Sequence, residues 1–222
     1  MRDEKTGMFR NRLVKVFRHL GRQAKRLLVS CYRLYDHDLP EFPFRIEFYG
    51  DKLYVAEYKR RHGLSEEAHD EWLEKSLDIM SEVLGVPEEN IFLKLRQRKP
   101  GRLGQYQKHD TAGSEWVVEE SGLKFIVNLS DYLDTGLFTD HRVTRQLVKE
   151  ESPGKKVLNL FAYTGTFSVF AAAGGAAEVL TVDLSNTYLQ WAERNMILNG
   201  FVDEKRYRYL RADVIKYLER VP

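Results

Sequence analysis

The strongest constraint on the fold is an alternation of strand and helix patterns that begins near residue 131. A helix pattern at 140–150 is followed by VLNLF (157–161), a helix, EVLTVDL (178–184), a helix at 186–199, YRYLRAD (207–213) and a last helix. Strands that alternate with helices form a parallel sheet with right-handed connections. Ligands of such sheets bind at the carboxyl ends of the strands. We therefore predict an α/β domain over 131–222 with its site at those ends.

The first of these strands runs into a tight turn. Residues 159–176 read NLFAYTGTFSVFAAAGGA, and Gly165 lets the backbone approach a ligand closely. The spacing is not G-x-G-x-x-G, because Tyr163 and Ser168 occupy the first and third glycine positions. A pyrophosphate cofactor needs more open backbone at the helix N-terminus. An adenosine ligand without phosphates fits better, and S-adenosylmethionine is the obvious candidate.

Acidic residues follow the second and third strands. Asp183 can accept hydrogen bonds from both hydroxyls of a ribose, and Asp213 can accept one from an adenine amine. The alternative is that Ser185 and Asp213 only cap helices.

Upstream, the segment DYLDTGLFTDHR (131–142) places Arg142 in the first turn of a helix, where a cation opposes the helix dipole. Arg142 therefore needs an anionic partner, either a ligand carboxylate or a nearby acid.

The N-terminal part of the chain is strongly basic. Residues 1–30 carry a net charge of +7, whereas the remaining residues sum to −5. Residues 1–28 have the spacing of an amphipathic helix with a basic face, and 93–108 form a second basic run. Such an arm points to a polyanion, either nucleic acid or an anionic membrane surface; the alternative is a solvated helix face and loop. The candidate RNA contacts are Arg10, Arg12, Lys15, Arg18, Arg22, Arg96, Arg98, Lys99, Arg102, Tyr106 and Lys108.

Residues 29–130 read as a smaller α+β domain. Two hairpins turn at Gly50-Asp51 and Ser121-Gly122, and a helix spans 65–85, so we expect a mostly antiparallel sheet.

No run approaches the roughly 20 apolar residues of a membrane span. The single cysteine, Cys31, is typical of a reducing cytoplasm, and no Cys/His cluster has the spacing of a metal site.

Several longer strings resemble one family. CYRLYDHDLPEF (31–42), QYQK (105–108), NLSDYLDTGLFTDHR (128–142), NLFAYTGTFSVFAAAGGA (159–176) and TVDLSNTYLQWAERNMILNG (181–200) resemble the guanine-N7 methyltransferase half of the bacterial RlmKL ribosomal RNA methyltransferases. The resemblance extends over nearly the whole chain. It implies a class I, Rossmann-like S-adenosylmethionine fold that modifies 23S rRNA, with residues 29–130 as the domain that contacts the substrate RNA.

The resemblance also implies the cofactor contacts. The methionine moiety would lie against the loop residues Asn159, Phe161, Ala162, Tyr163, Thr164 and Gly165. Asp183 and Leu184 would hold the ribose, Asp213 and Val214 the adenine, and Phe138 and Arg142 would close over the cofactor.

Guanine N7 carries a lone pair, so its methylation removes no proton and needs no general base. Methylation of cytosine C5 would instead need a cysteine nucleophile. We interpret the single cysteine, Cys31, as a core residue and not as such a nucleophile.

One departure from the family concerns the C-terminus. Members continue into a fourth strand with an Asp-Pro-Pro motif, whereas this chain stops at Val221-Pro222. We therefore expect an incomplete sheet in which 157–161 has an open edge, and either self-association through that edge or its cover by the N-terminal helix. Two rival functions remain: an RNA-binding module with a non-catalytic α/β scaffold, and a nucleotide-dependent oxidoreductase.

Overall fold

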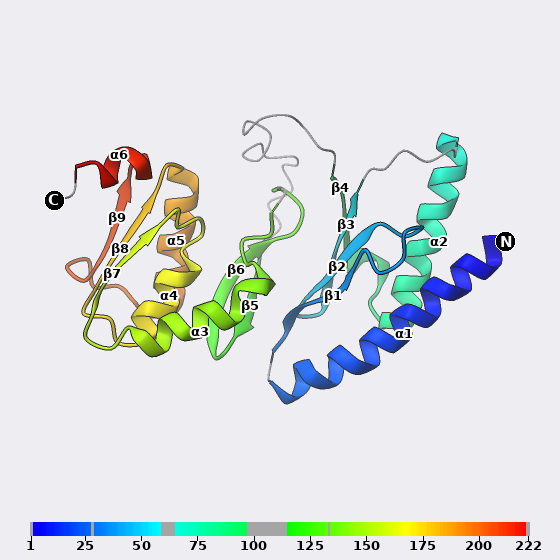
Figure 1. Ribbon diagram of the computed structural model, residues 1–222, viewed down its shortest axis with the longest axis horizontal. Helices are drawn as coiled ribbons and strands as arrows, with labels where there is room; N and C mark the ends of the chain where they lie inside the picture. The colour runs from blue at the N-terminus through cyan, green and yellow to red at the C-terminus, as the bar shows by residue number, and fades with distance from the viewer. Residues whose placement is uncertain (1, 28, 59–64, 97–114, 133, 221–222) are drawn as a thin grey trace. The chain divides into compact units, whose positions relative to one another are not determined.

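The computed structural model describes residues 2–27, 29–58, 65–96, 115–132 and 134–220. The chain divides into two compact units. The N-terminal unit comprises residues 1–114 and 129–133, and the C-terminal unit comprises residues 115–128 and 134–222. Figure 1 shows the helices and strands of both units.

The N-terminal unit is a four-stranded sheet with two long helices. Its elements are α1 (Arg2–Arg26), β1 (Cys31–Asp36), β2 (Phe44–Tyr49), β3 (Lys52–Tyr58), α2 (Glu66–Leu84), η1 (Glu88–Asn90) and β4 (Ile91–Arg96). The strand order is β1-β2-β3-β4; the first two pairings are antiparallel and the third is parallel. Gly50, at a φ of +67°, makes the predicted β2–β3 turn. The mostly antiparallel sheet expected from the sequence is therefore present.

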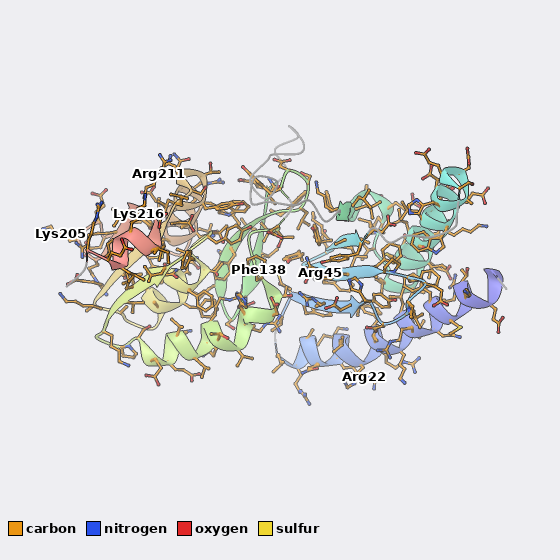
Figure 2. All side chains as sticks on the ribbon, turned by 45° about the horizontal axis from the view of Figure 1, so that its top comes forward. Arg22, Arg45, Phe138, Lys205, Arg211 and Lys216 are labelled. Atoms are coloured by element: carbon orange, nitrogen blue, oxygen red, sulfur yellow. The ribbon has the colours of Figure 1, made fainter. Side chains whose placement is uncertain are left out.

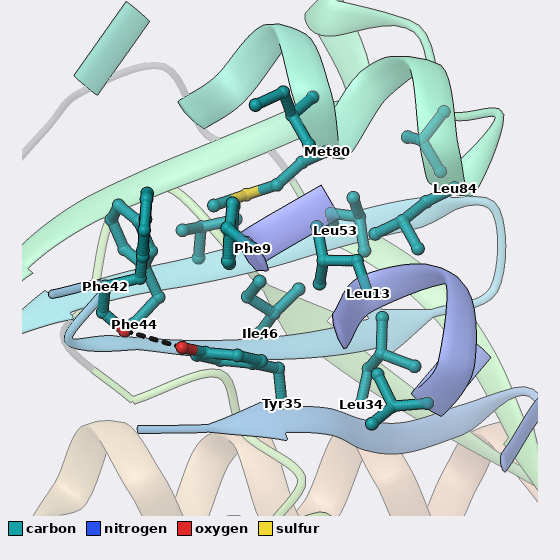
Figure 3. Packing of buried hydrophobic residues seen from close by; sticks show 14 of the residues in the cluster. Phe9, Leu13, Leu34, Tyr35, Phe42, Phe44, Ile46, Leu53, Met80 and Leu84 are labelled. Carbon is teal, nitrogen blue, oxygen red and sulfur yellow. Dashed lines mark hydrogen bonds between the residues drawn. The ribbon is translucent and has the colours of Figure 1, made fainter. Parts of the chain in front are cut away.

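The core of this unit lies between the sheet and both helices. Phe9 and Leu13 of α1 are fully buried, and they pack with Ile46 and Leu53 of the strands and with Met80 of α2 (Figure 3). Their spacing along α1 is the apolar stripe expected of an amphipathic helix. The first helix is thus part of the fold of this unit. Cover of the strand 157–161 by this helix stays a prediction.

The C-terminal unit contains a hairpin and a three-stranded parallel sheet. Its elements are β5 (Glu115–Glu120), β6 (Leu123–Asn128), η3 (Thr139–His141), α3 (Arg142–Glu151), β7 (Lys156–Leu160), α4 (Thr166–Ala173), β8 (Glu178–Asp183), α5 (Asn186–Leu198), β9 (Tyr207–Arg211) and α6 (Val214–Leu218). The sheet order is β7-β8-β9, with both pairings parallel. The predicted alternation of strands and helices is confirmed. Within the described residues, β7 pairs with β8 alone.

The domain boundary that we predicted at residue 131 does not match these units. The hairpin β5–β6 belongs to the C-terminal unit, although it precedes that boundary. The reason is long-range hydrogen bonding to α5. Trp191 Nε1 donates to the carbonyl of Ile126 at 3.1 Å, and the side chain of Asn199 pairs with both backbone groups of Lys124 at 2.7 and 2.8 Å. Such contacts cannot be inferred from the local pattern of the hairpin.

Candidate cofactor site

The loop after β7 has an unusual backbone. Phe161, Tyr163 and Gly165 have left-handed φ angles of +53°, +51° and +69°. The left-handed region is unfavourable for residues with a Cβ, so the surroundings must hold this conformation. The loop backbone is held by hydrogen bonds from Ala162 N to the carbonyl of Val182 at 3.1 Å and from Gly165 N to the carbonyl of Ala162 at 2.9 Å. A Cβ on Gly165 would come 2.5 Å from the Cβ of Ala192, so no larger residue fits here.

Asp183 stands at the end of β8, next to this loop. Its Oδ2 accepts a hydrogen bond from Tyr163 N at 2.9 Å, and its Oδ1 accepts one from Ser185 N at 2.9 Å. Each carboxylate oxygen has a second lone pair, so both can still accept from a hydroxyl. The two backbone donors therefore fix the orientation of the carboxylate without exhausting its capacity to bind a ribose. Ser185 caps α5 by accepting from Tyr188 N, as the alternative interpretation held.

The interior side of the loop is polar and closed. Asn159 Nδ2 donates to Ser168 Oγ at 2.9 Å, and Ser168 shares a hydrogen bond of 2.8 Å with Thr181 Oγ1. Thr164 is fully buried, and its hydroxyl donates to the carbonyl of Gly136. Asn159 and Thr164 thus use their side chains to fasten the loop to its own unit. A direct side-chain contact with the cofactor remains a prediction for both residues.

Aromatic side chains surround Tyr163. The ring centroid of Phe138, labelled in Figure 2, lies 5.4 Å from that of Tyr163, and Tyr188 meets Tyr163 edge-on at 4.5 Å. Tyr163 OH donates to the carbonyl of Asp134 at 3.3 Å. These contacts join the segment before α3 to the loop after β7. Closure of Phe138 over the cofactor stays a prediction. Phe138 is still 39% exposed, so part of its ring is available for a ligand.

Arg142 has the acidic protein neighbour that we had left open as an alternative to a ligand carboxylate. Its Nε lies 3.5 Å from Oε2 of Glu120, a residue with no exposed surface. Arg145, one turn further along α3, binds the same carboxylate through two hydrogen bonds of 2.8 Å and is itself fully buried. Two guanidinium groups therefore share one carboxylate. The local sequence pattern does not single out Arg145, since a charged residue on a helix is ordinarily exposed.

The end of β9 contributes a cap and several exposed apolar side chains. Asp213 Oδ1 accepts from the backbone N–H groups of Ile215 and Lys216, so Asp213 caps α6, and its role at the adenine stays a prediction. Val214 is buried. Phe161, Leu184 and Ile215, at or just after the carboxyl ends of three parallel strands, are 67%, 61% and 60% exposed. Exposed apolar side chains beside an oriented carboxylate are suited to a flat base attached to a ribose.

The candidate RNA contacts on α1 fall into two groups. Arg10 and Arg12 form ion pairs with Glu82 and Asp38. Lys15, Arg18 and Arg22 are exposed, and the described part of the chain offers them no ion-pair partner; Figure 2 labels Arg22. The candidates from the second basic run lie outside the residues whose side chains are described: Arg96, Arg98, Lys99, Arg102, Tyr106 and Lys108.

The parallel sheet, the tight loop after β7 and the acid at the end of β8 are typical of a class I methyltransferase fold, in which ligands bind at the strand ends. The residues fit S-adenosylmethionine, because the carboxylate of Asp183, held by two backbone donors, can still accept hydrogen bonds from hydroxyl groups. A family model described as S-adenosylmethionine-dependent methyltransferase matches residues 90–221. The chain belongs to this family, whose cofactor is S-adenosylmethionine.

The chain is similar to ribosomal RNA methyltransferases. It is 50% identical over 211 residues to ribosomal RNA large subunit methyltransferase K of Neisseria meningitidis, covering 95% of this chain and 59% of that protein. It is 49% identical over 220 residues to ribosomal RNA large subunit methyltransferase K/L of Methylococcus capsulatus, covering 98% of this chain and 30% of that protein. The chain therefore spans about a third to three fifths of the length of these relatives.

Solved structures show the same fold. A crystal structure described as a methyltransferase in complex with S-adenosylhomocysteine superposes with a TM-score of 0.72 at 25% identity, covering 95% of this chain and 53% of that one. A structure described as an S-adenosylmethionine-dependent methyltransferase from Streptococcus mutans gives a TM-score of 0.71 at 25% identity, covering 95% and 54%. No helix in the described ranges has the length and hydropathy to cross a membrane.

Proposed function

We propose that this chain binds S-adenosylmethionine between the loop Asn159–Gly165, Asp183 and Asp213, and that it takes part in methylating guanine N7 of large-subunit ribosomal RNA. The observation that carries the proposal is the carboxylate of Asp183, held by two backbone donors beside a strained loop. The similarity to ribosomal RNA methyltransferases supports the choice of RNA. The resemblance of residues 128–142 and 159–200 to the guanine-N7 half of its family supports the choice of atom. A ribosomal RNA substrate also implies the cytoplasm.

The residues of the site suit a reaction that depends on positioning. When bound, the cofactor would supply a methyl group on a sulfonium, for transfer to the lone pair of guanine N7 with the thioether of S-adenosylhomocysteine as the leaving group. Because N7 carries no proton, the protein needs no general base. The expected contribution of this chain is to hold the cofactor in one orientation, and positioning of this kind lowers a bimolecular barrier substantially. The contact of Phe138 with the ring of Tyr163 supports a role for Phe138 in covering the cofactor.

The cofactor assignment is tested by titrating the chain with S-adenosylhomocysteine in a calorimeter. Asp183→Asn keeps the size of the side chain and removes its charge, so we expect binding to weaken by about 1–3 kcal/mol, the usual loss for a charged hydrogen-bonding group. Glu178→Gln at the other end of β8 is the matched control, because Glu178 pairs with Lys156 and Arg208 on the surface. Equal affinity of both variants and the parent would refute the ribose assignment. Binding of NAD in place of S-adenosylhomocysteine would favour the oxidoreductase.

The RNA assignment is tested through the salt dependence of binding to a large-subunit rRNA fragment. Phosphate contacts release counterions, so we expect the triple variant Lys15→Gln, Arg18→Gln, Arg22→Gln to reduce the slope of log K against log salt by about 0.7–0.9 per lost contact. Lys149→Gln, Lys155→Gln, Lys156→Gln makes the same change in charge in the C-terminal unit and serves as control. Equal slopes would assign the basic face to solvent. RNA binding without S-adenosylhomocysteine binding would favour a non-catalytic RNA module.

The open edge of β7 supports a further part of the proposal. Leu158 is 43% exposed, and its strand pairs only with β8 among the described residues. An unpaired strand edge with apolar neighbours templates pairing with another strand. We expect the isolated chain to associate with a second copy through this edge, and Leu158→Lys to reduce the association. A concentration series in light scattering that finds the same monomer for both chains would contradict this.

A further inference from the structure

Asn195 occupies a position on α5 that joins two other parts of the C-terminal unit. The side chain has no exposed surface. Its Nδ2 donates to the carbonyl of Thr164 in the cofactor loop at 2.9 Å, and its Oδ1 accepts from the backbone N–H of Ile126 in the hairpin at 2.9 Å. One planar amide therefore connects β6 to the loop that follows β7.

The chemistry of this bridge is specific to an amide. Ile126 N–H can only donate and the Thr164 carbonyl can only accept, so the residue between them must present one acceptor and one donor in the same plane. Aspartate presents two acceptors, and leucine presents neither. Both backbone groups are buried with it, and a buried polar group that loses its partner is costly. Only asparagine, among side chains of this size, satisfies both.

The loop that Asn195 contacts needs outside support. Phe161 and Tyr163 have left-handed φ angles that are unfavourable for residues with a Cβ, and Thr164 lies directly after Tyr163. The N–H of Tyr163 is one of the two backbone donors that orient Asp183. A change at the Thr164 carbonyl is therefore one residue away from a donor that helps to set the direction of the Asp183 carboxylate, the proposed ribose ligand.

We propose that Asn195 is a positioning residue, which holds the cofactor loop in its left-handed conformation and so sets the affinity for the cofactor from outside the site. This inference rests on the proposed cofactor site and adds a residue that does not contact the ligand. Asn199, the C-cap residue of the same helix, provides the contrast. It pairs with both backbone groups of Lys124 in the hairpin and with the carbonyl of Asn195. Among the described residues, none of its hydrogen bonds goes to the cofactor loop 159–165.

The test compares Asn195→Asp, Asn195→Leu and Asn199→Leu in the full chain. Asn195→Asp keeps the acceptor for Ile126 and removes the donor to Thr164, whereas Asn195→Leu removes both. The first measurement is hydrogen exchange of the ligand-free protein. We expect the amides of 161–165 to exchange about tenfold faster in both Asn195 variants, the change that corresponds to loss of one hydrogen bond, and at the parent rate in Asn199→Leu.

The second measurement is titration with S-adenosylhomocysteine alongside thermal unfolding. We expect both Asn195 variants to bind about tenfold more weakly and Asn199→Leu to bind within twofold of the parent, although each substitution lowers the unfolding temperature. A purely structural role would lower stability in all three and leave affinity unchanged. Unaltered exchange of 161–165 in Asn195→Asp overturns the inference whether or not the parent binds the ligand. Absence of binding by the parent would instead refute the proposed cofactor site.

Discussion

Replacement of Glu120 is expected to destabilise the C-terminal unit more than replacement of its partner Arg145. Glu120 and Arg145 are both fully buried and are joined by two hydrogen bonds of 2.8 Å. Glu120→Gln leaves Arg145 without a counter-charge and turns an amide N–H towards a guanidinium N–H. The usual cost of breaking a buried pair in this way is about 3–5 kcal/mol. Arg142, with its Nε 3.5 Å from the same carboxylate, adds a second cation to the uncompensated site.

Arg145→Met is expected to cost less. It removes one guanidinium, and the carboxylate of Glu120 keeps Arg142 as a partner. The difference between the two variants is then at least about 1.5 kcal/mol, the lower value for a hydrogen bond to a charged group. The double variant should cost less than the sum of the single variants, because it removes both members of the pair.

Urea unfolding followed by tryptophan fluorescence measures these differences. The three tryptophans are Trp72, Trp116 and Trp191, so a Trp72→Phe background confines the signal to the C-terminal unit. Glu151→Gln is the control, because its ion pair with Lys155 is exposed and such pairs contribute about 0–1 kcal/mol. A cost below about 1 kcal/mol for Glu120→Gln would refute the reasoning. So would a larger cost for Arg145→Met than for Glu120→Gln.

Three further predictions concern packing and pH. Phe9→Ala should lower the stability of the N-terminal unit by about 3–5 kcal/mol in chemical denaturation, since the ring is fully buried and stacks on Phe42 at 4.3 Å, whereas Met8→Ala, at an exposed position, should cost little. Gly136→Ala should destabilise the C-terminal unit and weaken S-adenosylhomocysteine binding, because the φ of Gly136 is +97° and a Cβ would lie 2.5 Å from the ring of Trp191. The control Gly122→Ala, with a φ of +76° and open space around it, should affect stability alone, and an equal loss of binding in both variants would contradict the packing argument. Burial raises the pKa of Tyr35 from 10.0 to about 12, so Tyr35 ionises at a lower pH in the unfolded chain than in the folded protein. The stabilisation that the buried neutral hydroxyl contributes is therefore complete below pH 10 and is lost as the pH rises through about 12. Tyr35→Phe should unfold with a shallower dependence on pH across this window, and parallel curves for the two proteins would disprove the assignment.

Much of the C-terminal fold is predictable because its signals are local. The apolar runs of β7 and β8, Ser185 before α5 and Gly200 after it each report the conformation of their own segment. Since parallel strands end at one side of a sheet, the order of these segments also predicts that Asp183 lies beside the loop after β7, and the contact with Tyr163 N confirms this. The amphipathic pattern of α1 likewise predicts that Phe9 and Leu13 are buried.

What the sequence could not determine depends on contacts between distant segments. Phe161 and Tyr163 have no sequence feature that predicts a left-handed φ, because the loop is held by β8 and α5 and not by its own residue preferences. The hairpin β5–β6 joins the C-terminal unit through side chains about 65–75 residues away. Arg145 and Asn195 are polar residues on helices, a pattern that normally indicates solvent, and both are buried because a partner arrives from another element. Local periodicity records which face of a segment is apolar, whereas the partner that meets a buried polar group is decided only when the whole chain has folded.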